Sequence, residues 1–227
     1  MTQAKTHTDR EYENQLTVLR ERLLLMTGRV EEMIADAVRA LVSRDERLAR
    51  ETIEKDHQVN RDEMECDQMC LTLLARRQPM GSDLRFITLA LKMVTDLERI
   101  GDLAVNVCER VIDLMAFSQL KPYRDIPLMA DRVQRMIREA SDAFVNGNES
   151  LAQQVIAQDD EVDRLYDQVF SEILEIMRRD PGVLEPAIHI QSVIKYLERM
   201  ADHATNLAEE VIYMLRGRDV RHFGKLS

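Results

Sequence analysis

Two stretches of the sequence place the same acidic pair at the same spacing. "DLERIGDLAVN", residues 96–106, carries Glu98 and Asp102 four positions apart, and "YLERMADHATN", residues 196–206, carries Glu198 and Asp202 in the same way. Residues four apart lie on one face of an α-helix, so each pair brings two carboxylates together. Neighbouring carboxylates repel unless a proton or a cation neutralises them, and their oxygens suit hard cations, iron or manganese. The chemistry that this pattern indicates is metal binding.

The acids coincide with an apolar sector of the helices that carry them. At about 100° per residue, Glu98, Asp102 and the more distant Glu109 fall within an arc of about 40°. Apolar residues occupy that sector too: Ile87, Leu91, Val94, Val105 and Ile112 near the first pair, and Ala187, Ile194 and Ile212 near the second. Carboxylates in an apolar sector are unfavourable unless something compensates their charge. The placement therefore favours a partner for the acids.

A second polar line precedes each acidic pair. Asp56 and Asn60 are four apart in the first half of the chain, and Asp159 and Asp163 are four apart in the second. In an antiparallel hairpin of long helices, such lines can face the acidic pairs and bring several oxygen ligands together. Alignment of the two halves adds the secondary candidates Asn106, Glu109, Asn206 and Glu209.

Three explanations of the acidic pairs stay open on the residues alone. Charges usually lie on a solvated helix face. The acids could also form buried ion pairs with Arg99, Arg199 or arginines of other helices, which specify register more than they stabilise. The third explanation is a site for a divalent or iron-type metal ion, which the duplication and the apolar sector favour.

The sequence has no recognisable catalytic arrangement. The Glu-x-x-His spacing of carboxylate oxidases occurs at Glu54 and His57, but Ala157 and Asp160 stand at the equivalent positions of the second half. There is no Gly-rich phosphate loop, no nucleophile elbow and no HExxH motif. We therefore expect no enzyme and no organic cofactor. A carboxylate-bridged metalloenzyme and a purely structural helical scaffold are the alternatives.

Helical periodicity runs through almost the whole chain and predicts six long helices. The first helix is expected over about 11–42, the second from an Asp45 cap to about 76, and the third from a Ser82 cap to about 117. The fourth is expected to begin near Pro127, the fifth at an Asn148 cap, and the sixth after "RRDPGVLEP". The sixth is expected to end near Arg216. Only 7 Gly, 5 Pro and 4% aromatic residues support an all-α fold.

The two halves of the chain resemble each other. "AVRALVSRDERLARETIEKDHQVNR" at 37–61 matches "ASDAFVNGNESLAQQVIAQDDEVDR" at 140–164, and the acidic pairs align at a slightly different offset. Internal repeats of this kind predict repeated structural units. We expect two tandem, pseudo-repeated antiparallel three-helix bundles, 11–118 and 127–216, with a disordered N-terminus at 1–10 and a tail at 217–227.

The charge balance and the apolar patterning exclude several partners. A formal net charge of -10 repels nucleic acid and anionic membranes. No apolar run approaches the roughly 18 residues of a membrane span, and the first residues lack the apolar core of a secretory signal, so we expect a cytoplasmic protein. Cys66, Cys70 and Cys108 lie among apolar neighbours and indicate buried thiols.

Several segments together resemble the PhoU family of bacterial phosphate-transport accessory and regulatory proteins. These are "LLARRQPMGSDLRFITLALKMVTDLERIGDLAVNVCERV", "YLERMADHATNLAEEV", "VEEMIADAVRAL" and "DHQVNRDE". The resemblance covers nearly all of the chain except its first ten or so residues and its tail. It implies a non-catalytic, often dimeric cytoplasmic protein that restrains phosphate uptake and represses the phosphate-starvation response. The implied partners are the ATPase subunit of the phosphate ABC importer and its sensor histidine kinase, so contact with the membrane would be through partners only.

The resemblance also implies metal-binding residues. The family's ligands carry over onto Glu98, Asp102, Glu198 and Asp202, together with Asp159, Asp163 and Asp56 of the preceding helices. Asn60 stands where the family usually has Asp, which lowers the charge of the first site and implies a weaker metal affinity there.

Overall fold

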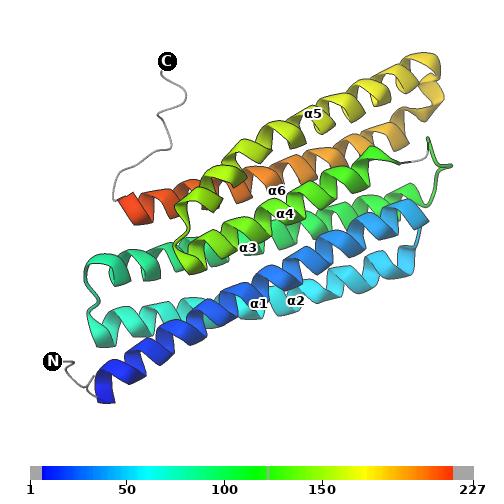
Figure 1. Ribbon diagram of the computed structural model, residues 1–227. Helices are drawn as coiled ribbons and strands as arrows, with labels where there is room; N and C mark the ends of the chain where they lie inside the picture. Colours follow the sequence, from blue (N-terminus) through cyan, green and yellow to red (C-terminus); the bar gives the residue numbers. More distant parts are fainter. Residues whose placement is uncertain (1–6, 122, 217–227) are drawn as a thin grey trace.

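The computed structural model describes residues 7–121 and 123–216 of the 227-residue chain (Figure 1). These residues form six long α-helices and one short 3₁₀ turn, with no strand in either described range. The elements are α1 (His7–Ser43), α2 (Glu46–Arg77), α3 (Gly81–Leu114), α4 (Asp125–Asn146), α5 (Glu149–Arg179), η1 (Pro181–Val183) and α6 (Leu184–Arg216). The predicted all-α class is confirmed.

Two helix starts follow the predicted side-chain caps. The Asp45 side chain accepts a hydrogen bond from the Leu48 backbone N–H at 3.0 Å, and Asn148 accepts one from Leu151 at 3.1 Å. Each cap satisfies a backbone donor that the first helical turn cannot pair internally. These two residues occupy equivalent places in the two repeats, so α2 and α5 begin in the same way.

The predicted Ser82 cap is wrong. Helix α3 begins one residue earlier, at Gly81, after Met80, whose side chain makes no capping bond. Gln78 ends α2 with a φ of 47° and Gly81 has a φ of 58°, so the turn is made by two left-handed backbone conformations. Such conformations are set by the direction in which the chain must turn, and glycine adopts them most readily.

The N-terminal prediction also needs correction. Residues 7–10, expected to be part of a disordered segment at 1–10, belong to α1, whereas residues 1–6 lie outside the described ranges. The predicted tail at 217–227 lies outside them as well. Helix α4 begins at Asp125, two residues before Pro127, which is compatible because a first helical turn tolerates proline.

Helix α3 ends at Leu114, short of the predicted 117, and a distant arginine binds the backbone at this end. The Arg44 guanidinium donates to the backbone oxygens of Leu114, at 3.0 Å, and Phe117, at 2.6 Å. Leu114 is the last residue of the helix, so the bond to its oxygen satisfies one carbonyl of the last turn, and the bond to Phe117 holds the segment that follows. The bonds tie the α1–α2 turn to the end of α3.

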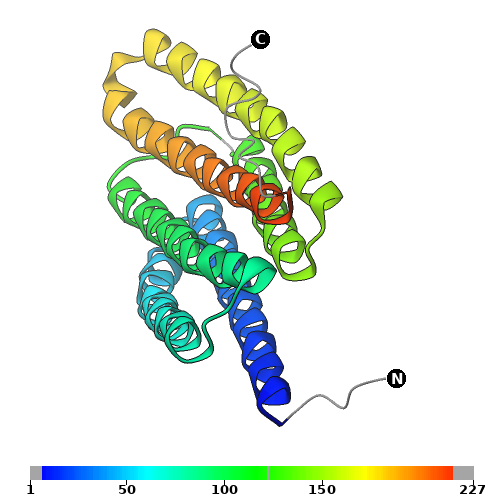
Figure 2. The same cartoon turned by 90° about the vertical axis from the view of Figure 1, so that its left-hand side faces the viewer.

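The helices form two three-helix bundles packed side by side (Figures 1 and 2). Helices α1, α2 and α3 contact one another, as do α4, α5 and α6. Across the boundary α3 packs on α6 and α1 packs on α4, while α2 and α5 contact only helices of their own bundle and η1. The tandem repeat is therefore a two-layer molecule with α2 and α5 on its flanks.

One apolar core crosses the boundary between the bundles. Fully buried side chains of all six helices belong to a single cluster, including Leu23 of α1, Leu97 of α3, Ile137 of α4 and Leu197 of α6. A buried hydrogen bond of 2.9 Å joins the hydroxyls of Thr27 on α1 and Ser141 on α4 within this core. None of the described helices is long and apolar enough to cross a membrane.

Candidate metal-binding clusters

The predicted acidic lines lie at the seams of the two outer hairpins. Asp56 and Asn60 come from α2 and lie beside α3, which carries Glu98 and Asp102. Helices α2 and α3 are in contact at Gly101, where a Cβ atom would lie at ordinary contact distances of 3.4 Å from Val59 Cγ1 and 3.5 Å from Asp56 Oδ1. The antiparallel hairpin therefore brings the two polar lines together, as the spacing predicted.

The carboxylates of the first hairpin influence one another. Burial raises the pKa of Glu98, and the negative charges of Asp102, Glu63 and Asp56 raise it further. The pKa of Asp102 is raised by burial and then by Asp56, although much of its side chain reaches solvent at the rim. Burial and the charges of Asp67 and Asp102 raise the pKa of Glu63. We refer to Asp56, Asn60, Glu63, Glu98 and Asp102 as the first acidic cluster.

Two buried oxygens of this cluster have no hydrogen-bond partner among the described residues. Asn60 donates from Nδ2 to Asp56 Oδ2 at 2.8 Å, which leaves Asp56 Oδ1 and Asn60 Oδ1 unpartnered. Buried polar atoms are nearly always satisfied in proteins, so each such atom calls for an explanation. A bound cation is one explanation, because both oxygens are acceptors and carboxylate and amide oxygens are ligands of hard cations.

The second hairpin holds Asp159 and Asp163 of α5 next to Glu198 and Asp202 of α6. Burial, and then the charges of Asp163 and Asp202, raise the pKa of Asp159 to about 6. Burial followed by the charge of Glu198 also raises the pKa of Asp163 and of Asp202. Lys195 donates to Glu198 Oε2 at 2.6 Å. These five residues form the second acidic cluster.

The exposure and ion pairs of the acidic residues bear on the three explanations of the acidic pairs. Asp102, Asp163 and Asp202 are exposed, whereas Glu98 and Glu198 are half-buried, so the clusters lie at the rim of the hairpins and not on a fully solvated face. Arg99 and Arg199 are exposed, and neither forms an ion pair with the acids among the described residues. An ion pair does form in the second cluster, but its cation is Lys195.

The donor set fits a hard cation in its chemistry but is not assembled as a ligand shell. Carboxylate and amide oxygens are what Mg²⁺, Mn²⁺ and Ca²⁺ prefer. Within the described ranges, however, no group of three or more His, Cys, Asp or Glu side chains is arranged so that it could hold a metal ion. The residues that would hold a metal are Asp56, Asn60, Glu98 and Asp102 in the first cluster and Asp159, Asp163, Glu198 and Asp202 in the second.

The secondary candidates are placed differently. Glu109 is exposed beside Arg110, with an Oε2–Nη2 distance of 3.6 Å. Asn206 lines a cleft between α3 and α6 that also contains Lys92 and Asp96, on another side of α6. Asn106 and Glu209 are half-buried on α3 and α6, and their role stays a prediction. Asn206 therefore lies in a cleft apart from the α5–α6 seam, and a role of Glu109 in metal binding stays a prediction.

Sequence reasoning missed two acids on α2. Glu63 and Asp67 continue the line of Asp56 at spacings of 7 and 11, which return to the same helix face. The Asp67 carboxyl has one buried oxygen without a partner among the described residues, and burial raises its pKa. The helical spacing of Glu63 and Asp67 from Asp56 is the sequence signal by which both could have been recognised.

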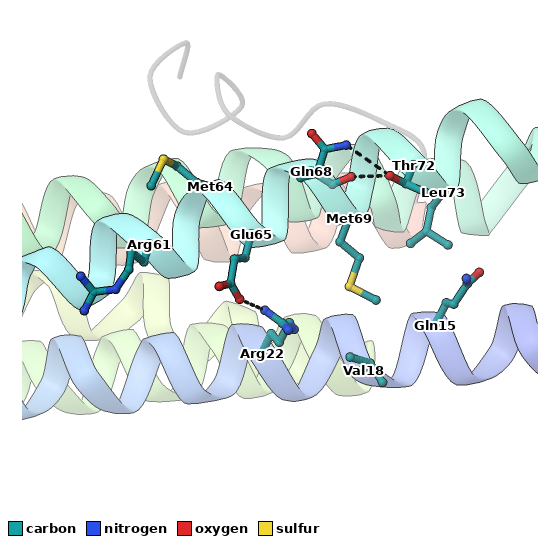
Figure 3. A pocket seen from close by; sticks show the side chains of 10 residues that line it. All are labelled: Gln15, Val18, Arg22, Arg61, Met64, Glu65, Gln68, Met69, Thr72 and Leu73. Carbon is teal, nitrogen blue, oxygen red and sulfur yellow. Dashed lines mark hydrogen bonds and ion pairs between the residues drawn. The ribbon is translucent and has the colours of Figure 1, made fainter.

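A separate groove runs between α1 and α2 (Figure 3). It has a volume of about 620 Å³, and Val18, Met69 and Leu73 give it an apolar lining. The ion pair of Arg22 with Glu65 crosses it between the two helices. The lining contains no pair of residues suited to nucleophilic or acid–base catalysis.

The chain matches known proteins over most of its length. The family model of the PhoU domain matches residues 23–111 and again residues 126–211, one segment in each half. A relative from Pseudomonas aeruginosa, named a phosphate-specific transport system accessory protein PhoU homolog, is 41% identical over 96% of this chain and 90% of its own. A homolog of the same name from Pseudomonas putida is 39% identical over 96% and 86%.

Solved structures agree with this match. The crystal structure of PhoU from Pseudomonas aeruginosa superposes with a TM-score of 0.86 at 40% identity, covering 91% of this chain and all (100%) of that one. The phosphate transport system regulatory protein PhoU from Streptococcus pneumoniae gives a TM-score of 0.84 at 27% identity, with 92% and 99% covered. Sequence, duplication and fold agree, and the chain belongs to the PhoU family.

Proposed function

We propose that this protein is an accessory regulator of phosphate-specific transport without catalytic activity. The observation that carries the proposal is the match over nearly the full length to relatives that bear this description, at 41% and 39% identity. The chain covers 90% and 86% of these relatives, so the comparison concerns whole proteins and not a shared fragment. We place the protein in the cytoplasm, as a homodimer.

The proposed mechanism is that of an adaptor. It contacts the ATPase subunit of the phosphate ABC importer and the sensor histidine kinase, and it lowers phosphate uptake and the starvation response when phosphate is plentiful. An adaptor shifts the state of a partner only if it binds one state of that partner more tightly than the other. Long helices with continuous exposed faces supply the contact surface that such binding needs.

Deletion of the gene tests this function. We expect phosphate-starvation genes to be expressed in phosphate-rich medium, and a plasmid copy of the wild-type chain to restore repression. Unchanged expression in the deletion strain would contradict the regulatory role. Capture of membrane proteins on the tagged chain at high and low phosphate tests the contacts separately, and recovery of the importer and kinase in equal amounts at both would contradict a state-dependent adaptor.

Metal binding by the acidic clusters is part of the proposal and has its own test. Asp56 Oδ1 and Asn60 Oδ1, buried without partners in the described residues, support it. We expect purified protein to bind divalent metal, and the double variant E198Q/D202N to bind less while keeping its helical circular dichroism. An unchanged metal content would favour a scaffold of ion pairs. Metal-dependent oxygen consumption would instead favour the carboxylate-bridged metalloenzyme.

A further inference from the structure

The two acidic clusters differ at Asn60, which corresponds to Asp163, and at two further positions that bear on how their charge is compensated. Helices α3 and α6 align at an offset of 100, as Glu98 does with Glu198, which places Thr95 opposite Lys195. Helices α2 and α5 align at an offset of 103, as Asp56 does with Asp159, which places Glu63 opposite Tyr166. The carboxyl of Glu63 thus corresponds to the aromatic ring of Tyr166, and the hydroxyl of Thr95 corresponds to the amine of Lys195.

In the second cluster, the ammonium group of Lys195 is held among the acids. It donates to Glu198 Oε2 at 2.6 Å and lies 5.7 Å from the centroid of the Tyr166 ring. A cation near a ring face is attracted to it, so the ring and the acid position the ammonium together.

The Tyr166 ring is itself fixed by a neighbour. It stacks on Phe170 with a centroid distance of 6.0 Å and an interplanar angle of 5°. Stacked aromatic pairs restrict each other's rotation and bury apolar surface. In the first repeat, the equivalent residues of this pair are Glu63 and Asp67, so no such support for an ammonium exists there.

In the first cluster, no described side chain plays the part of Lys195. The Thr95 hydroxyl donates to the Leu91 carbonyl at 3.2 Å, within its own helix. Arg99 is exposed, and it forms no ion pair with Glu98 among the described residues. Among the described residues, the carboxylates of Asp56, Glu63, Glu98 and Asp102 therefore have no bonded ammonium, whereas the second cluster contains one that is bonded to Glu198.

We infer that Lys195 is the built-in counter-ion of the second acidic cluster and that the first cluster takes its cation from solution, so that a divalent metal fills the first cluster first. This inference rests on the metal binding proposed above. A metal that enters the second cluster must displace a hydrogen-bonded ammonium, whereas a metal that enters the first relieves repulsion and satisfies unpartnered oxygens. This order of metal binding is the reverse of the one implied by Asn60, which lowers the charge of the first cluster and on its own would make it the weaker site.

Titration of the EDTA-treated, full-length protein with Mn²⁺ tests the order. We expect the tighter of two binding events to disappear in the E98Q/D102N variant and the weaker one in E198Q/D202N. Replacement of the counter-ion, Lys195→Thr, should tighten binding to the second cluster by about tenfold or more, because the competing ammonium is gone. Installation of an ammonium in the first, Thr95→Lys, should weaken binding there by a similar factor of about ten.

Matched variants control for net charge. Lys92→Thr removes a lysine from α3 that pairs with Glu210 outside the clusters, and Thr88→Lys adds one at an exposed position of α3. Both should leave the two Mn²⁺ affinities unchanged. If Thr95→Lys loses its helical circular dichroism, Lys195→Thr and Lys195→Met alone decide the question.

The outcomes separate this inference from the proposal on which it rests. Tighter binding by the second cluster in the wild type, or affinities that Lys195→Thr does not change, would overturn the assigned order while metal binding stands. If neither the wild type nor Lys195→Thr binds Mn²⁺, both the metal proposal and this inference are wrong. Either result leaves the regulatory role in phosphate transport to its own genetic test.

Discussion

Asp159 shows what crowding does to a single side chain. Its pKa rises from the ordinary 3.8 to about 6, first through burial and then through Asp163 and Asp202. A carboxyl with a higher pKa in the folded than in the unfolded chain favours folding while it is protonated. Its contribution is complete below about pH 4 and is lost as the pH rises through about 6, so the ionised group destabilises the metal-free protein at neutral pH.

We therefore expect Asp159→Asn to stabilise the metal-free protein at pH 7 by about 1 kcal/mol, because solvent screens part of the repulsion that the variant removes. Urea unfolding in EDTA at pH 4, 5, 6 and 7 measures this, and the decline in the free energy of unfolding across that range should become shallower. Asp131→Asn, at an exposed position of α4, is the control for the change in net charge. A loss of stability at pH 7 in Asp159→Asn would contradict the expectation.

The site could be predicted from sequence where it depended on helical spacing alone. Glu98, Asp102 and Asp56 lie in the same seam because residues four apart share a face and because the hairpin is antiparallel. Lys195, three residues before Glu198, was not predicted as a partner of the acids, because the sequence pattern considered only arginines as their possible cations. Whether its long side chain turns toward the acids or toward solvent depends on Tyr166 of another helix, which no local pattern specifies.

At the scale of the helix, the two repeats use the same start signal. Asp45 and Asn148 each accept a backbone hydrogen bond from the residue three positions on, and each was recognisable as a polar residue before an amphipathic segment. Ser82 satisfied the same sequence rule, yet α3 begins before it, at Gly81. The left-handed backbone at Gln78 and Gly81 determines that start, and it follows from how α2 and α3 must pack.

Removal of the caps should distinguish the three positions. We expect Asp45→Ala and Asn148→Ala each to lower the free energy of unfolding by about 1 kcal/mol, since each leaves a first-turn N–H without its partner. Ser82→Ala should change it by less than about 0.5 kcal/mol, as an exposed residue outside any cap. Chemical denaturation of the three variants gives the comparison, and an equal loss in Ser82→Ala would show that α3 is capped by its serine after all.

On the scale of the whole molecule, the two bundles share one core. Sequence periodicity predicted each bundle but not how one packs on the other, because α3 and α6 each carry apolar residues around more than one face. The structure uses the additional face for the α3–α6 and α1–α4 contacts. Neither repeat buries all of its apolar surface without the other.

A shared core predicts a single cooperative unfolding transition. We expect Leu97→Ala, at a fully buried position, to cost about 2–5 kcal/mol and to reduce amide-exchange protection in both repeats. The control is Leu25→Ala, at a position on α1 that is 55% exposed, and it should cost less than about 1 kcal/mol. Two separate transitions, or a loss of protection confined to residues 7–121, would mean that the repeats are independent domains.

The hydrogen bond between Thr27 and Ser141 has a consequence for how repeats choose their partners. At the offset of 103, Thr27 corresponds to Ala130 and Ser141 to Val38, so the equivalent residues of the other repeat are apolar. If the first repeats of two copies paired with each other, Thr27 would face Val38 and would keep only its bond to the Leu23 carbonyl of its own helix. The loss of one hydrogen bond between the repeats costs about 0.5–1.5 kcal/mol. The bond therefore favours pairing of the first repeat with the second over pairing with another first repeat.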